Sequence, residues 1–134
     1  MEREILFRGK RKDNGEWICG DLLQDVESGI CAIVSYVNLG GNIHDLSESC
    51  IFAVIPETVG QYTGLTDKNG VKIFEGDIVQ AIECIYVIMW DSVRAMFYLR
   101  GPISRVSVDF YNYFASDLIV IGNIYDNPEL LKKE

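Results

Sequence analysis

The sequence predicts a mainly β protein, and three observations support this class. Short runs of β-branched, aliphatic and aromatic residues recur along the 134-residue chain, with Gly, Asn, Asp and Pro between them. Helical periodicity is almost absent before Asn127. About ten such runs, each of strand length, indicate a barrel or roll. Because 49% of the residues are apolar, the chain is able to build a hydrophobic core.

The apolar runs and the turn residues between them predict the elements in order. We expect strands over residues 4–8, 16–23, 30–37, 50–55, 78–82, 85–90, 94–100 and 118–121. A hairpin is predicted at 12–16, where Asn14 and Gly15 suit the positive φ values of a type I′ turn. Residues 38–49 are polar and are the best candidate for a mobile loop. Asn127 as N-cap and Pro128 as first helical residue predict a C-terminal helix of about two turns.

Residues 59–79 hold the densest turn chemistry and are expected to be the structural centre of the C-terminal part. Asn69 and Gly70 predict a tight turn in which Gly70 has a positive φ. Ile78 or Val79, in the strand that follows, is expected to be buried.

A second polar turn is predicted at Glu75, Gly76 and Asp77. Two carboxylates around a glycine are able to bind a cation or to act as an acid and base pair. A simpler interpretation is that the Asp77 carboxylate accepts hydrogen bonds from neighbouring backbone N–H groups, and we favour it.

The net charge is −8 and is unevenly distributed. Residues 1–12 carry five bases against two acids, and the remainder carries seven bases against eighteen acids. A body this acidic repels phosphate at long range. The N-terminal cluster consists of Arg8, Lys10, Arg11 and Lys12. It is interpreted as a solvated strand end; local contact with phosphate, or with the acidic face of another copy, remains open.

No catalytic, cofactor-binding or metal-ligating residue is predicted. The usual nucleophile, phosphate-binding, dinucleotide-binding and zinc-protease motifs do not occur. His44 is the only histidine and lies in the polar loop. The four cysteines show no C-x-x-C spacing and are expected to be reduced, metal-free and buried or half-buried. They are Cys19, Cys31, Cys50 and Cys84.

No apolar run approaches the ~20 residues that a membrane-spanning helix needs. The N-terminus lacks a basic start followed by an apolar segment, so no signal peptide is expected. The sequence therefore predicts a cytoplasmic protein.

An aromatic cluster lies between the predicted strands 94–100 and 118–121. It comprises Phe110, Tyr111, Tyr113 and Phe114. Such residues stack on bases, face a partner protein, or complete a core or a subunit interface. Because exposed strand edges pair with other chains unless they are blocked, we also expect a homo-oligomer. The basic N-terminal segment would lie against the acidic body of a neighbouring copy.

Three stretches of the sequence resemble the YopX family: residues 3–17, residues 55–79 and residues 120–131. The central stretch contains Ile55-Pro56-Glu57-Thr58-Val59-Gly60-Gln61-Tyr62-Thr63-Gly64-Leu65-Thr66-Asp67-Lys68-Asn69-Gly70 and then Ile73-Phe74-Glu75-Gly76-Asp77-Ile78-Val79. The resemblance implies a protein encoded by a phage or prophage of Gram-positive bacteria, with a small SH3-type β-barrel in its C-terminal part. It supplies no catalytic residues. We accordingly expect an N-terminal β unit over 1–54 and the barrel over 55–134.

Together these observations predict a non-catalytic accessory protein that binds a phage or host protein or copies of itself. The alternative is a nucleic-acid-associated factor that uses the basic N-terminal cluster and a small barrel. A carboxylate-dependent hydrolase using Glu75 and Asp77 is a distant third hypothesis.

Overall fold

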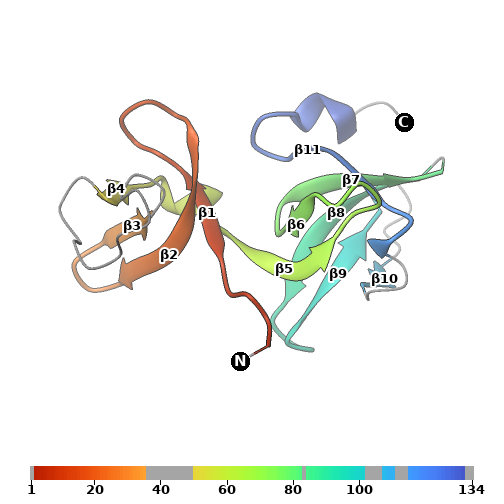
Figure 1. Cartoon of the computed structure of the whole chain (residues 1–134), viewed down its shortest axis with the longest axis horizontal. Coiled ribbons are helices and arrows are strands. Elements are labelled where there is room, and N and C mark those ends of the chain that lie inside the picture. Colours follow the sequence, from red (N-terminus) through yellow and green to blue (C-terminus); the bar gives the residue numbers. More distant parts are fainter. Residues whose placement is uncertain (1, 36–49, 83, 102–106, 111–114, 132–134) are drawn as a thin grey trace. The chain divides into compact units, whose positions relative to one another are not determined.

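The computed structural model describes residues 2–35, 50–82, 84–101, 107–110 and 115–131 (Figure 1). The described chain is mainly β, as predicted, with antiparallel strands and no long helix. It divides into two compact units, Met1–Gln61 and Tyr62–Glu134. The division lies within strand β5 (Gly60–Thr66), a few residues beyond the boundary that the sequence suggested after residue 54.

The N-terminal unit is one antiparallel sheet with the strand order β4-β3-β2-β1-β5. Its elements are β1 (Phe7–Lys10), β2 (Trp17–Asp25), β3 (Ile30–Val34), β4 (Ile51–Ala53) and the 3-10 helix η3 (Pro56–Thr58). Side chains alternate between the two faces of the sheet. Ile33 of β3 and Val54, just after β4, are fully buried.

Gly20 of β2 lets the strands of this unit approach closely. A Cβ at this position would lie 2.0 Å from the backbone oxygen of Val34, on the neighbouring strand β3. No side chain fits within that distance of a backbone atom, so only glycine suits this position.

The first hairpin forms, but the predicted type I′ turn is wrong. The last pair between β1 and β2 joins Lys10 to Trp17, so residues 11–16 make the connection. Gly15 has φ of +74°, whereas Asn14 is not among the described non-glycine residues with positive φ. Instead the Asn14 side-chain oxygen accepts the Glu16 N–H at 2.9 Å, which is the Asx-turn alternative for such a residue.

The C-terminal unit contains a five-stranded antiparallel sheet with the order β10-β9-β8-β7-β11. Its strands are β7 (Asp77–Ala81), β8 (Cys84–Asp91), β9 (Met96–Arg100), β10 (Ser107–Asp109) and β11 (Ile119–Asn123). The end of β5 pairs with β6 (Lys72–Phe74). The core includes Ile73, Val79, Ile88, Leu99 and Leu118, all fully buried.

The sheet in this unit is open at both edge strands, so the expected SH3-type barrel is not confirmed. The predicted C-terminal helix begins at Pro128, as expected, but its described part is the 3-10 helix η4 (Pro128–Leu131) of 4 residues, which is shorter than the two turns predicted. The predicted loop at 38–49, including His44, lies outside the described residues. Among the described residues, no helix has the length and apolarity needed to cross a membrane.

Both predictions for the turn region are confirmed. Gly70 has φ of +81°, and Ile78 and Val79 are both fully buried. The turn at 75–76 joins β6 to β7, with Gly76 at φ of +92°. The Asp77 carboxylate is 2% exposed and accepts the Phe74 N–H at 2.7 Å, which is the structural role that we favoured.

The cysteine prediction is right for two positions and wrong for two. Cys50 is buried and Cys31 is half-buried, but Cys19 and Cys84 are exposed. Cys19 lies on the outer face of β2, and Cys84 is the first residue of β8 after a tight turn. Apolar neighbours in the sequence do not bury a residue when it lies on the solvent face or at a hairpin tip.

Candidate functional site

The basic N-terminal cluster is divided by the structure. Arg8 and Lys10 lie on the same face of β1, and both approach the ring of Trp17 on β2. The Arg8 guanidinium carbon lies 4.8 Å from the ring centroid, and the Lys10 ammonium lies 5.7 Å from it. These cation–π contacts fix two of the four predicted bases against a half-buried indole.

The other two bases follow the end of the strand. Arg11 makes a two-point ion pair with Asp13, at 2.9 and 2.6 Å, and its guanidinium lies 4.4 Å from the Phe52 ring centroid. The hydrogen bond from Arg11 holds the pKa of Asp13 below its ordinary value. Lys12 is exposed. The cluster is therefore partly neutralised within its own unit.

The aromatic cluster is described only at its first member. Phe110 is 9% exposed and belongs to the core of the C-terminal unit. Tyr111, Tyr113 and Phe114 lie outside the described residues.

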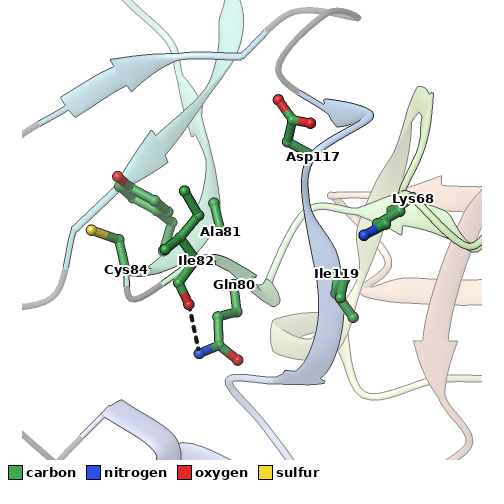
Figure 2. A pocket seen from close by; sticks show the side chains of 8 residues that line it. Lys68, Gln80, Ala81, Ile82, Cys84, Asp117 and Ile119 are labelled. Atoms are coloured by element: carbon green, nitrogen blue, oxygen red, sulfur yellow. Dashed lines mark hydrogen bonds between the residues drawn. The ribbon is translucent and has the colours of Figure 1, made fainter.

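A pocket in the C-terminal unit is the strongest site candidate, and the sequence analysis did not identify it. Its volume is about 870 Å³. Figure 2 shows the end of the β7–β8 hairpin on one side and the start of β11 with the 67–70 turn on the other. The lining residues are Lys68, Gln80, Ala81, Ile82, Cys84, Tyr86, Asp117 and Ile119.

Ile82 is the most unusual residue of this pocket. Ala81 pairs with Cys84, so only residues 82 and 83 connect β7 to β8. A two-residue hairpin connection requires positive φ and favours Asn or Gly, yet Ile82 adopts φ of +56°. Positive φ is strongly disfavoured for a β-branched residue. Its side chain is nevertheless 95% exposed.

The opposite wall of the pocket is held in place by Asp67. This carboxylate is 5% exposed and accepts three backbone N–H groups, from Asn69 and Val71 at 2.8 Å and from Val120 at 3.0 Å. Burial opposes its ionisation, but the three hydrogen bonds outweigh burial and lower the pKa of Asp67. The neighbouring Lys68 N–H donates to the Leu118 oxygen at 2.8 Å. The turn is thereby fixed to the start of β11.

Polar groups on the hairpin wall are paired with each other. The Gln80 side-chain amide donates to the Ile82 backbone oxygen at 3.3 Å, which supports the hairpin turn (Figure 2). Burial raises the pKa of the Tyr86 hydroxyl, and its hydrogen bond with Cys84 raises it further. Tyr86 therefore remains a neutral phenol at physiological pH.

The surface around this pocket combines aliphatic groups with one ammonium and one carboxylate. Ile82 and Ile119 are exposed aliphatic side chains, and Lys68 and Asp117 are exposed charged side chains. We call these four residues the hairpin surface. An apolar pocket with a few charged groups at its rim suits the binding of a protein side chain. Among the described residues, no cluster of three or more His, Cys, Asp or Glu is arranged to hold a metal ion.

Sequence reasoning missed this site because it read residues 78–82 as one continuous strand. The turn after Ala81 carries neither Gly nor Asn, so no local turn signal marks it. Only the short spacing between two apolar runs was available as a signal.

Comparisons with known proteins identify a matching family model and a solved structure of similar fold. Residues 6–132 match the model of the YopX protein family. No curated protein matches the chain. The crystal structure of protein EF1440 from Enterococcus faecalis is similar, with a TM-score of 0.63 and 23% sequence identity, over 97% of this chain and 99% of that one. That likeness supports the fold. Because the family match covers nearly the whole sequence, the chain belongs to the YopX protein family.

Proposed function

We propose that this protein is a non-catalytic accessory protein of a phage or prophage that works in the bacterial cytoplasm by binding another protein or copies of itself. The hairpin surface would be its binding site. Family membership supports the phage origin, and the exposed aliphatic groups around an open pocket support the binding role.

The observation that carries this proposal is the conformation of Ile82. A left-handed backbone costs a non-glycine residue roughly 1–2 kcal/mol, and this residue is 95% exposed at φ of +56°. In the free chain this cost is not offset, because the Ile82 side chain buries almost no apolar surface. Burial against a partner would gain about 1.5–3 kcal/mol for an isoleucine. A strained and exposed apolar residue beside a pocket is therefore better explained by binding than by folding.

The substitution Ile82→Asn tests this proposal because it separates folding from binding. Asparagine tolerates positive φ and removes the apolar side chain. We expect the variant to fold at least as stably as the wild type. It should no longer capture the proteins that the wild type captures from lysates of host cells carrying the prophage.

Val93→Asn is the matched control. Val93 is 92% exposed in the β8–β9 turn of the same unit and does not line the pocket. The Val93→Asn variant should capture the same proteins as the wild type. Equal capture by Ile82→Asn and wild type would reject the hairpin surface as the binding site.

Binding of nucleic acid is the second candidate, and one observation favours it. Arg8 and Lys10 present two cations over the half-buried ring of Trp17, a combination that serves phosphate contact and base stacking. The net charge of −8 opposes it. Micromolar binding to generic DNA or RNA that weakens steeply with salt, and that is lost in Arg8→Ser/Lys10→Ser, would favour this candidate over the first.

A hydrolase that uses Glu75 and Asp77 receives the least support. Asp77 is 2% exposed, and its carboxylate accepts a hydrogen bond from the Phe74 N–H. This carboxylate therefore stabilises the turn and is buried away from a substrate in solvent. An activity found in a broad substrate screen and abolished by Asp77→Asn, with the fold retained, would revive the hypothesis.

A further inference from the structure

The hairpin surface carries both a projection and a hollow. Ile82 extends from the tip of the β7–β8 hairpin, and the pocket lies beside it, bounded on its far side by Ile119 (Figure 2). When two identical surfaces meet around a two-fold axis, every contact between unlike residues occurs twice with the roles exchanged. In such an arrangement the Ile82 side chain of each copy would enter the pocket of the other, against Ile119.

The charges on this surface favour the same arrangement. The whole chain carries a net charge of −8, which opposes association between copies. The described residues that line the pocket carry one ammonium, Lys68, and one carboxylate, Asp117. Around a two-fold axis, Lys68 of one copy and Asp117 of the other would form two symmetric pairs of opposite charge. The pocket lining therefore supplies both charges that such a pair needs.

We propose that the protein bound by the hairpin surface is a second copy of this chain, in a two-fold symmetric dimer. Ile82 of each copy is the anchor in the pocket of the other, and Lys68 and Asp117 set the register between them. This inference rests on the proposed binding role of that surface and identifies the partner.

Sedimentation across a range of concentrations tests the dimer. At tens of micromolar and physiological salt, the wild-type species should have twice the 15.2 kDa mass of one chain and should dissociate on dilution. Ile82→Asn removes two anchors per dimer, each worth roughly a factor of ten in affinity, so the dissociation constant should rise about 100-fold. The control Val93→Asn should leave it unchanged.

Charge reversal tests the orientation of the two copies. Lys68→Glu alone and Asp117→Lys alone each place like charges across the interface and should weaken self-association. An equimolar mixture of the two variants should form a heterodimer. In that heterodimer the two introduced side chains face each other as one pair of opposite charge, and the retained Lys68 and Asp117 form the other. A purely structural defect in either variant would not be repaired by mixing.

The outcomes separate this inference from the proposed function. A single-chain mass at every concentration overturns the dimer, as does a dimer unaffected by Ile82→Asn. If the chain is monomeric but Ile82→Asn still loses a captured protein, the dimer is rejected and the binding role of the surface stands. If Ile82→Asn changes neither self-association nor capture, both are rejected.

Discussion

Asp67→Asn should destabilise the C-terminal unit strongly, because one buried carboxylate fastens the 67–70 turn to β11. Its Oδ1 accepts the N–H groups of Asn69 and Val71, and its Oδ2 accepts the N–H of Val120, 53 residues away. An asparagine keeps one acceptor oxygen and presents an NH₂ group to the remaining N–H. When that oxygen keeps the two bonds within the turn, the Val120 donor is left unsatisfied.

The magnitude follows from these three bonds. An unsatisfied buried N–H costs about 1–3 kcal/mol, and hydrogen bonds to a charged group contribute more than those to a neutral amide. We therefore expect Asp67→Asn to lower the free energy of unfolding by about 3 kcal/mol at pH 7. Glu129→Gln, which removes an exposed carboxylate from the same unit, should change it by less than about 0.5 kcal/mol.

The effect should depend on pH with a definite sign. The pKa of Asp67 is lower in the folded chain than its ordinary value of 3.8. As the pH falls, the unfolded chain takes up this proton first, so the stabilisation is complete well above pH 3.8 and is lost progressively below it. The difference in stability between wild type and Asp67→Asn should therefore be constant from about pH 7 to pH 5 and shrink below pH 3.8.

Urea denaturation at several pH values measures both quantities on the same proteins. In a Trp17→Phe background, which removes the tryptophan of the N-terminal unit, fluorescence of Trp90, on β8, reports on the C-terminal unit. A loss below about 1 kcal/mol at pH 7 would show that Asp67 does not clamp the turn. A difference that grows toward acid pH would contradict the direction assigned to its pKa.

Three further predictions concern backbone and thiols. Gly20→Ala places a Cβ 2.0 Å from the Val34 backbone oxygen and should cost more than about 2 kcal/mol in urea denaturation; a loss similar to that of an exposed substitution would contradict the close strand approach. Gly70→Val should cost about 1–2 kcal/mol more than Gly70→Asn, because φ is +81° and no atom lies within 4 Å of a Cβ there; equal losses would exclude backbone strain as the cause. Of the thiols at the described positions, those of Cys19 and Cys84 should react rapidly with a thiol reagent in the folded protein, as mass spectrometry would show; slow labelling of both would contradict their exposure.

Local sequence signals were sufficient for most of the hairpins but not for β5. Residues 60–66 contain Gly60 and Gly64, which predict turns because glycine is depleted in strands, although Thr63 and Thr66 favour a strand. The segment is extended because its two ends pair with different strands: Gly60 pairs with Arg8 of β1, and Thr66 pairs with Lys72 of β6. Such long-range pairing is not visible in a single sequence, so tertiary contacts override the local preference.

The turn motif could be predicted from the sequence, whereas the pocket could not. Gly70, Gly76 and Asp77 were predictable because their roles depend on neighbouring backbone, through positive φ and a local hydrogen bond. The pocket depends on Ile82 and Asp117, which are far apart in the sequence, and on a turn without turn-forming residues. Shared position on a fold, rather than spacing in the sequence, brings these residues together.

The most direct test of the binding role is the free energy of unfolding of Ile82→Asn, measured together with its binding. Stability should be measured at a concentration low enough for the wild type to be a single chain, because association would otherwise add to wild-type stability. We expect Ile82→Asn to gain about 0.5–1 kcal/mol of stability from relief of the positive-φ strain, and to lose both self-association and the capture of other proteins. A variant that is less stable than the wild type, or equally able to bind, would contradict the assignment of Ile82 as a binding anchor.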